Sequence, residues 1–316
     1  NSANNTIGTT FKPDLVWTKP RSNVGGNIIN DSVRGASLYL TTNTTNAELT
    51  DANYLTSFNS NGFSLGSTNF TNGYTMVGWQ WNAGSGSSSS NTNGSITSTV
   101  SVNQTAGFSI VTYTGTGANA TVGHGLGVAP SMIIGKVRST TNDWPVYHVS
   151  VGAGSVLALD LTAAATAGST YWNNTAPTSS VFSVGSAATT NQSGQTFVYY
   201  CFAAVKGYSA FGSYTGNGST DGTFVYTGFR PRWVMMKRTD TLGYWAIKDS
   251  SRNGYNQTDP LLYANVSDAE YSAAQAIDIL SNGFKLRSTG ADTNASGSTY
   301  IYLSLIHISE PTRPLY

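Results

Sequence analysis

Charged side chains are scarce in this sequence of 316 residues: they make up 10%, against about 25% in typical soluble domains. Sixteen basic and fifteen acidic residues give a net charge of +1. Because there is no basic surplus, we expect neither nucleic acid nor an anionic lipid surface as a partner. No apolar run reaches the roughly 18 residues needed to cross a bilayer, so membrane insertion is not expected either.

Cysteine and histidine are almost absent. Cys201 is the only cysteine, which excludes an intrachain disulfide and a thiolate metal cluster. The three histidines are His124, His148 and His307, and none has a second histidine at metal-ligand spacing. We therefore expect no metal and no cofactor. No nucleophile elbow and no phosphate-binding glycine motif occurs, so the sequence predicts a protein that is not an enzyme.

Glycine and aromatic residues are plentiful, with 34 Gly, 18 Tyr and 7 Trp. Short runs rich in Val, Ile, Thr, Tyr and Phe alternate with Gly, Asn, Ser and Asp, which is typical of strands and turns. Helical periodicity is nearly absent, and its best candidate, 267–280, is a short helix or a turn. The pattern predicts an all-β fold of tandem β-sandwich repeats, of jelly-roll or lectin-like type.

One sequence unit occurs three times. Each of three prolines opens an apolar run that a lysine closes six positions later: Pro13 with Lys19, Pro130 with Lys136, and Pro231 with Lys237. Two further sets recur at fixed distances from the prolines: Asn27, Trp144 and Trp245, then Asp31, His148 and Asp249. In the first run Leu15 and Trp17 alternate with Val16, which predicts a strand buried on both faces.

These repeats divide the chain. We expect a partial repeat one over 1–83, a Ser/Gly/Asn-rich flexible linker over 84–95, a complete repeat two over 96–206 and a truncated repeat three over 207–303. Repeat one lacks a counterpart of the Tyr-Thr-Gly segment that precedes the other two prolines. The segment from Leu303 to Arg313 resembles a translated sequencing adaptor. We therefore expect residues 304–316 to be foreign to the fold.

Four residues are the candidates for ligand binding. Asp31 and Asp249 share the pattern Asp-Ser-x-Arg, which suits either a polar ligand cup near the lysines or a turn whose Asp caps backbone amides. Trp144 and Trp245 occupy one repeat position. An exposed tryptophan would stack on a sugar, whereas a repeated tryptophan in a sandwich is otherwise a core residue.

Three segments of repeat two carry a family resemblance. Residues 107–115, 122–130 and 143–148, the last reading Asp-Trp-Pro-Val-Tyr-His, resemble a repeat of tail-fibre and other structural proteins of tailed phages, common in marine phages. Repeats one and three lack its His-Gly-Leu-Gly turn. The resemblance implies an extracellular location in the phage tail and partners among other virion proteins. It supplies no catalytic residues.

The expected function is that of a virion spacer that also contacts a host receptor or surface glycan. Fibre repeats of this kind are often trimeric, so a homo-oligomer, with a trimer as one form, is expected. Two other functions share the same composition: a secreted bacterial adhesin or carbohydrate-binding array, and an appendage of a depolymerase that lies outside the sequence.

Overall fold

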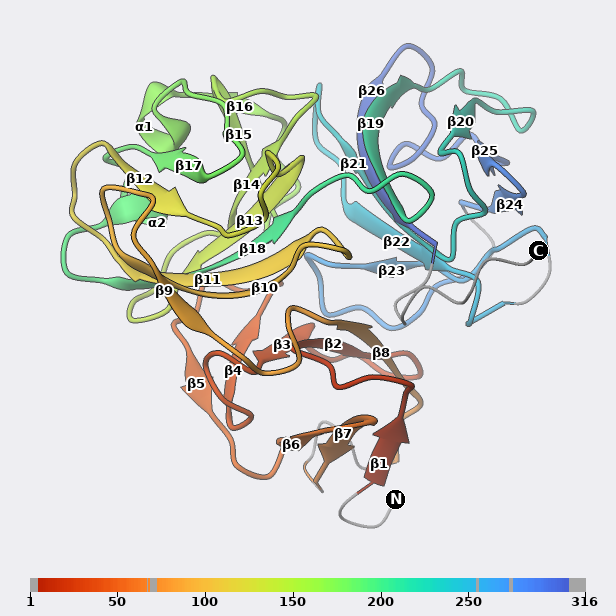
Figure 1. Cartoon of the computed structure of the whole chain (residues 1–316). Coiled ribbons are helices and arrows are strands. Elements are labelled where there is room, and N and C mark those ends of the chain that lie inside the picture. Colours follow the sequence, from red (N-terminus) through yellow and green to blue (C-terminus); the bar gives the residue numbers. More distant parts are fainter. Residues whose placement is uncertain (1–4, 67, 69–72, 254–255, 273–274, 307–316) are drawn as a thin grey trace, which may run out of the picture.

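Three β-sandwich repeats form the molecule (Figure 1). The computed structural model describes residues 5–66, 68, 73–253, 256–272 and 275–306. In this structure 42% is strand and 3% is helix, which confirms the predicted all-β class. In each repeat a larger main sheet faces a smaller outer sheet, and apolar side chains fill the space between them.

Repeat one has a main sheet of order β5-β4-β3-β2-β8 and an outer sheet of order β1-β7-β6. All pairs are antiparallel. The strands are β1 (Asn5–Gly8), β2 (Leu15–Pro20), β3 (Ile28–Asp31), β4 (Leu38–Thr41), β5 (Leu49–Thr50), β6 (Leu55–Asn59), β7 (Gly62–Leu65) and β8 (Met76–Trp81).

Repeat two has the longest main sheet, of order β16-β15-β14-β13-β18-β11-β10-β9, and the outer pair β12-β17. Its elements are β9 (Ser89–Asn91), β10 (Ser98–Asn103), β11 (Phe108–Thr114), β12 (Ala120–Gly123), β13 (Met132–Val137), β14 (Pro145–His148), β15 (Ser155–Ala158), β16 (Thr166–Ala167), β17 (Val181–Val184) and β18 (Thr196–Phe202), with two single-turn helices, α1 (Ser169–Trp172) and α2 (Ala188–Asn191).

Repeat three has a main sheet of order β19-β26-β21-β22-β23 and an outer sheet of order β20-β25-β24. Its elements are β19 (Ser209–Thr215), β20 (Phe224–Tyr226), β21 (Trp233–Arg238), β22 (Trp245–Asp249), β23 (Leu262–Tyr263), β24 (Ile277–Leu280), β25 (Gly283–Leu286) and β26 (Thr299–Leu305). Because 277–280 is β24, the helix considered for 267–280 is not formed there.

The post-proline strands are buried on both faces, as the sequence predicted. Val16 faces the interior of repeat one, and the equivalent Ile133 and Val234 face the interiors of repeats two and three. Leu15 and Trp17 point the opposite way, into a cluster to which all three repeats contribute. The second buried face is therefore covered by the other repeats.

This shared cluster, which we call the hub, joins the three main sheets. It contains Trp17, Trp79 and Trp81 of repeat one, with Phe202 of repeat two and Trp233 of repeat three. Trp233 meets the ring of Trp81 edge-on at 5.9 Å between centroids, and Trp81 contacts Phe202 at 6.4 Å. Edge-to-face contacts of this kind stabilise aromatic packing beyond the burial of area.

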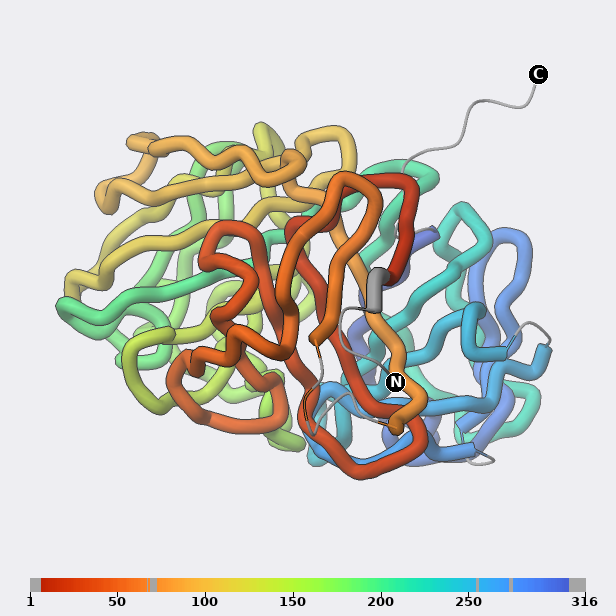
Figure 2. The backbone as a smooth tube through the Cα atoms, turned by 90° about the horizontal axis from the view of Figure 1, so that it is seen from below, coloured from red at the N-terminus to blue at the C-terminus, as the bar shows by residue number. Residues whose placement is uncertain are grey.

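The three repeats surround the hub in an approximate threefold arrangement. The outer sheets lie at the periphery and the main sheets at the centre (Figure 1). Seen from below, repeat one lies in front of and between repeat two, in yellow and green, and repeat three, in cyan and blue (Figure 2). The chain is therefore a closed group of three sandwiches rather than an extended row.

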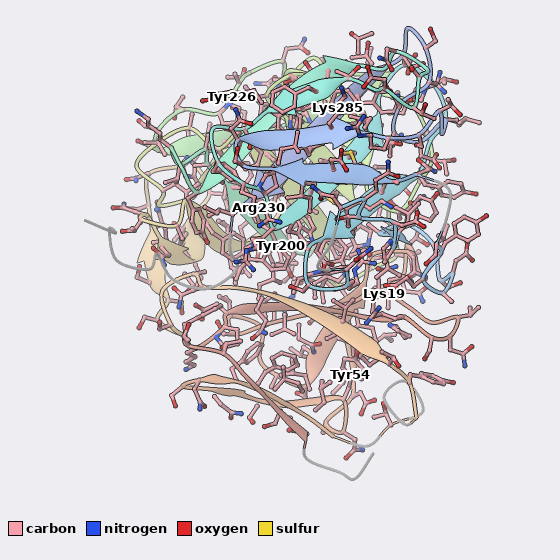
Figure 3. The ribbon with its side chains drawn as sticks, turned by 90° about the vertical axis from the view of Figure 1, so that its right-hand side faces the viewer. Lys19, Tyr54, Tyr200, Tyr226, Arg230 and Lys285 are labelled. Atoms are coloured by element: carbon pink, nitrogen blue, oxygen red, sulfur yellow. The ribbon has the colours of Figure 1, made fainter. Side chains whose placement is uncertain are left out.

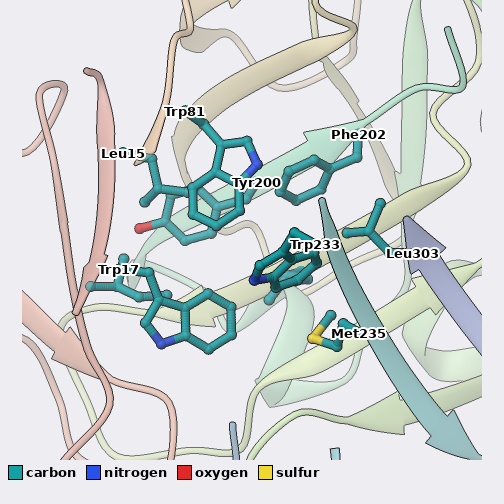
Figure 4. A pocket seen from close by; sticks show the side chains of 10 residues that line it. Leu15, Trp17, Trp81, Tyr200, Phe202, Trp233, Met235 and Leu303 are labelled. Atoms are coloured by element: carbon teal, nitrogen blue, oxygen red, sulfur yellow. The ribbon is translucent and has the colours of Figure 1, made fainter. Parts of the chain in front are cut away.

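The hub is closely packed. One small apolar void of about 10 Å³ remains at its centre, bounded by side chains of all three repeats, among them Trp81, Tyr200 and Trp233 (Figure 4). This volume is at the lower limit for one water, and its apolar lining offers a water too few hydrogen-bond partners. The void is a packing defect rather than a ligand cavity.

Two sequence boundaries need correction. The expected flexible linker 84–95 contains β9, which pairs with β10, and its Gly94 lies so close to the Thr121 carbonyl that a side chain would not fit. The last strand does not end at Leu303 either. Leu305 is 2% exposed and pairs with Ser209, so 304–306 belong to the fold, whereas 307–316 lie outside the described residues.

Removing one hub side chain should destabilise the whole molecule. Trp233→Ala deletes a ring that contacts repeat one, and we expect the free energy of unfolding to fall by about 3–5 kcal/mol. The matched control is Tyr226→Ala, an aromatic truncation at a side chain that is 65% exposed, with an expected change below about 0.5 kcal/mol. Urea titration of both variants measures the difference; equal effects would contradict a shared core.

Two truncations test the corrected end of repeat three. Ending the chain at Leu303 removes Ser304 and Leu305 from β26 and should lower the free energy of unfolding by about 2 kcal/mol or more, because a buried leucine and its strand pairs are lost. Ending it at Ile306 keeps all of β26. Thermal unfolding that is the same for both truncations would show that residues 304–306 are dispensable.

Candidate functional site

The two candidate aspartates close turns within their own repeats. Asp31 ends β3 and accepts the backbone N–H of Arg34 through Oδ1 and its Nε–H through Oδ2. Asp249 ends β22 and holds Arg252 in the same way. The aspartates are 0% and 3% exposed. The turn interpretation is therefore correct, and an accessible ligand cup at these residues is not formed.

The repeat position of the two aspartates, held by His148 in repeat two, also joins neighbouring repeats. We call such a set of three equivalent positions a column. The contacts are the Tyr200 hydroxyl to Asp31 Oδ2 at 2.8 Å, the Trp79 indole N–H to Asp249 Oδ2 at 3.1 Å, and His148 Nε2 to the Tyr302 carbonyl at 3.2 Å. They connect repeats one and two, three and one, and two and three. Each of the three residues thus serves one of the three junctions between repeats.

The candidate tryptophans occupy a second column of junction contacts. Trp144 donates its indole N–H to the carbonyls of Thr41 and Thr44, and Trp245 donates to the carbonyl of Ala158. Trp144 is 0% exposed and Trp245 1%. The expectation that these rings present an aromatic surface for sugars is therefore corrected, because both lie between repeats and their only polar group is already paired.

The three repeated lysines form a third column. Each Nζ donates to carbonyls in its own and the neighbouring repeat: Lys19 to Gly25 and Val266, Lys136 to Asn142 and Thr45, and Lys237 to Arg238 and Thr162. Burial lowers the pKa of each to about 8, although distant aspartates oppose the shift. These ammonium groups tie the repeats together rather than facing a ligand.

Two junctions carry the same partly buried ion network. At the first, Arg34 contacts Asp31 and Glu48 of its own repeat, and Arg138 of repeat two reaches Glu48 at 2.8 Å. At the second, Arg252, Asp249, Glu270 and Arg21 repeat the arrangement between repeats three and one. Burial opposes ionisation of Glu48, but its hydrogen bonds from both arginines outweigh this effect and keep its pKa below the usual value.

The junction between repeats two and three has uncharged residues in place of this ion network. The positions of the network hold His148, Val151, Ala165 and Thr239, and the Ala165 N–H donates to the Thr239 carbonyl where the other junctions add an ion pair. His148 Nδ1 accepts the Ser150 N–H, so the ring proton sits on Nε2 and points to repeat three. Burial lowers the pKa of His148 to about 4, although its hydrogen bond to the Tyr302 carbonyl acts in the opposite direction.

The remaining reactive groups are also internal. His124 is buried, with Nδ1 accepting the Leu126 N–H, and burial lowers its pKa. The buried thiol of Cys201 has its pKa raised by burial, which makes it a poor nucleophile. In the described part of the chain no cluster of His, Cys, Asp and Glu is suited to a metal. Neither described helix, at four residues each, approaches the length of a membrane span.

The outer sheet of repeat three offers a different surface. Phe224 and Tyr226 alternate with buried Val225 on β20 and are 43% and 65% exposed. Lys285 of β25 lies directly opposite Phe224. Tyr226 and Lys285 are seen on the same side of the molecule in Figure 3. We call Phe224, Tyr226, Lys285, Arg287, Asp221 and Asp278 the outer face of repeat three.

Ion pairs hold the polar part of the outer face. Asp221 contacts Lys285 at 2.6 Å and Arg287 at 3.2 Å, and Arg287 Nε donates to Asp278 at 2.6 Å. The hydrogen bond from Lys285 keeps the pKa of Asp221 below its usual value. Two exposed aromatic rings thus border a row of charged donors and acceptors.

The other repeats do not carry this surface. By register, Tyr226 corresponds to Gly123 in repeat two and Gly8 in repeat one, and Phe224 corresponds to Thr121. Gly123 is covered by Asn91 of the β9 segment, which leaves no space for a side chain. The same backbone therefore carries small residues in two repeats and large exposed ones in the third.

The family model for a domain of unknown function, DUF7483, matches residues 1–308. The chain belongs to this family. The matched residues span all three repeats. No curated protein and no solved structure matches the chain.

Sequence reasoning missed the outer face of this DUF7483 domain. Phe224-Val225-Tyr226 reads as an ordinary strand, and its composition does not separate an exposed face from a core. The comparison with Gly123 and Gly8 at the position of Tyr226 was the available signal, because a fold shared by three repeats does not require an aromatic residue there.

The buried, uncharged imidazole of His148 predicts that the protein is less stable in acid. His148 takes up a proton near pH 6.5 in the unfolded chain and near pH 4 in the fold, so between these values the unfolded chain binds more protons. The free energy of unfolding should therefore fall as the pH is lowered from 6.5 to 4, by up to about 3 kcal/mol from this residue.

Urea titrations at pH 7, 6 and 5 measure this effect in the wild type and in His148→Gln, whose side chain does not titrate. The variant should show a flatter pH dependence. Since Glu48 and Glu270 stay ionised in this range and His124 is present in both proteins, the difference isolates His148. Identical pH dependence would contradict the buried neutral imidazole.

Proposed function

We propose that the chain is a non-enzymatic attachment and structural module of a tailed-phage virion, located in the extracellular part of the tail. Residues 107–130 and 143–148 support this proposal through their resemblance to tail-protein repeats. The observation that carries it is the use of the repeated polar positions, which bond neighbouring repeats and leave no accessible catalytic set among the described residues.

The proposed contact surface is the outer face of repeat three, and its proposed ligand is a host surface glycan. The exposed rings of Phe224 and Tyr226 can pack on the apolar C–H faces of a sugar. Lys285, Arg287 and Asp221 offer hydrogen-bond donors and acceptors to hydroxyl groups beside them. The mixed charge of this row favours a neutral or weakly charged glycan.

The packing of repeat three gives this surface a rigid support. The outer sheet of repeat three rests on an interior core that includes Val225 and Phe284, so the two rings project from a rigid surface. A single site of this kind binds weakly, and several copies along a virion would raise the effective affinity through avidity. The expected homo-oligomer would carry one such site on each chain. The three repeats at the hub belong to one chain and do not by themselves supply further copies of the site.

A glycan array probed with a multimerised form of the whole chain tests this proposal. The double variant Phe224→Ala, Tyr226→Ala should lose at least 90% of the array signal. The control is Tyr271→Ala, which removes a 57% exposed aromatic outside this face and should leave binding unchanged. Array binding that survives the double variant would exclude the outer face as the sugar contact.

A further inference from the structure

The last strand of repeat one lacks a neighbour that the last strands of the other two repeats have, among the described residues. In repeat two β18 lies between β13 and β11, and in repeat three β26 lies between β21 and β19. In repeat one β8 pairs with β2, and no described strand pairs with its other edge. In Figure 1 this sheet runs from β5 to β8, where it ends. Such an edge leaves a row of backbone donors and acceptors unpaired.

The two sister repeats show what fits this edge. Both β11 and β19 run antiparallel to the last strand over seven residue pairs. Both strands end in Tyr-Thr and are followed by Gly, in Tyr113-Thr114-Gly115 and Tyr214-Thr215-Gly216. Equivalent strands at equivalent edges thus carry a common pattern, which defines the chemistry of a strand that would pair with β8.

The interior of repeat one lacks the side chains that such a strand supplies. In repeat two Val111 and Tyr113 of β11 enter the interior core, and in repeat three Tyr214 of β19 does so. Among the described residues, six buried apolar side chains form the interior core of repeat one, against eighteen and twelve in the others. Repeat one is therefore underfilled on the side where a strand is absent.

Met76 of β8 lies where the tyrosine of an added strand would pack. Tyr113 stacks on Phe197 with centroids 5.1 Å apart, and Tyr214 stacks on Tyr300 at the same distance. By register, Met76 occupies the position of Phe197 and Tyr300, and it is half-buried. A tyrosine at the equivalent point of an added strand would lie over this thioether, which is a favourable partner for an aromatic ring.

Gln80 of β8 carries a buried polar atom that an added strand could pair. Its side chain is 7% exposed, and its Oε1 has no hydrogen-bond partner among the described residues. Gln80 occupies the position of Cys201, and Cys201 lies opposite Ser109 of β11. A strand placed like β11 would bring a hydroxyl donor opposite this unpaired amide oxygen, whose burial is otherwise costly.

We infer that the free edge of β8 is a binding site for one extended peptide segment with the pattern of β11, Phe-Ser-x-x-x-Tyr-Thr-Gly. The segment binds antiparallel to β8, with its tyrosine over Met76 and its serine opposite Gln80. It adds a sixth strand to the main sheet of repeat one by β-augmentation. The site lies in repeat one and is independent of the glycan contact proposed for repeat three.

Hydrogen exchange of the whole chain with a synthetic peptide tests the site. The probe is the sequence of residues 106–116, and the matched control is the same peptide with Ile110→Pro, which cannot complete the ladder. The probe should slow exchange of β8 amides at least tenfold and raise the melting temperature by several degrees at saturation. Exchange in β18 serves as the internal control and should not change.

Fusing the same segment to the chain tests the site even if the free peptide binds too weakly to be detected. Placing the sequence of residues 107–115 directly before Asn1 leaves Gly115 and residues 1–4 as a connector, as long as the five residues between β11 and β12. Protection of β8 by either the free or the fused segment supports the inference. Unchanged exchange of β8 in both experiments, or equal protection by the proline control, overturns it.

Discussion

Burial of both faces of the three main sheets is the constraint on which the rest of the structure depends. One face of each sheet is covered by its own outer sheet, and the other is covered only when three repeats meet at the hub. A single repeat would expose Trp17 or Trp233 to water, and each such ring contributes a large share of the hydrophobic free energy. The fold is thus stable as a set of three.

Polar columns fix how the repeats meet. An apolar hub is tolerant of rotation, whereas the donor in Trp144, the ammonium of Lys136 and the carboxylate of Asp31 each need a partner at one place. Leaving any of them unpaired in the interior would cost about 1–3 kcal/mol or more. The columns therefore specify one angular arrangement, and the hub provides most of the free energy.

The sequence predicted the strands better than their environment. The alternation of Leu15, Val16 and Trp17 correctly indicates burial on both faces, because strand periodicity reports how a residue is solvated. It does not report which part of the protein covers the residue, so the hub between the repeats was not predicted. Trp144 was ambiguous for the same reason: an indole with one donor suits a sugar site and a buried junction equally.

Because the three repeats lie in one chain, the sequence of each can change independently of the others. In a ring of three identical chains, a substitution appears at all three equivalent positions and must be tolerated at each. Here Tyr226 replaces a glycine position in repeat three alone, while Gly123 keeps its close contact with Asn91 in repeat two. Covalent linkage thus allows repeat three to gain a new surface while repeats one and two keep the packing that holds repeat three in place.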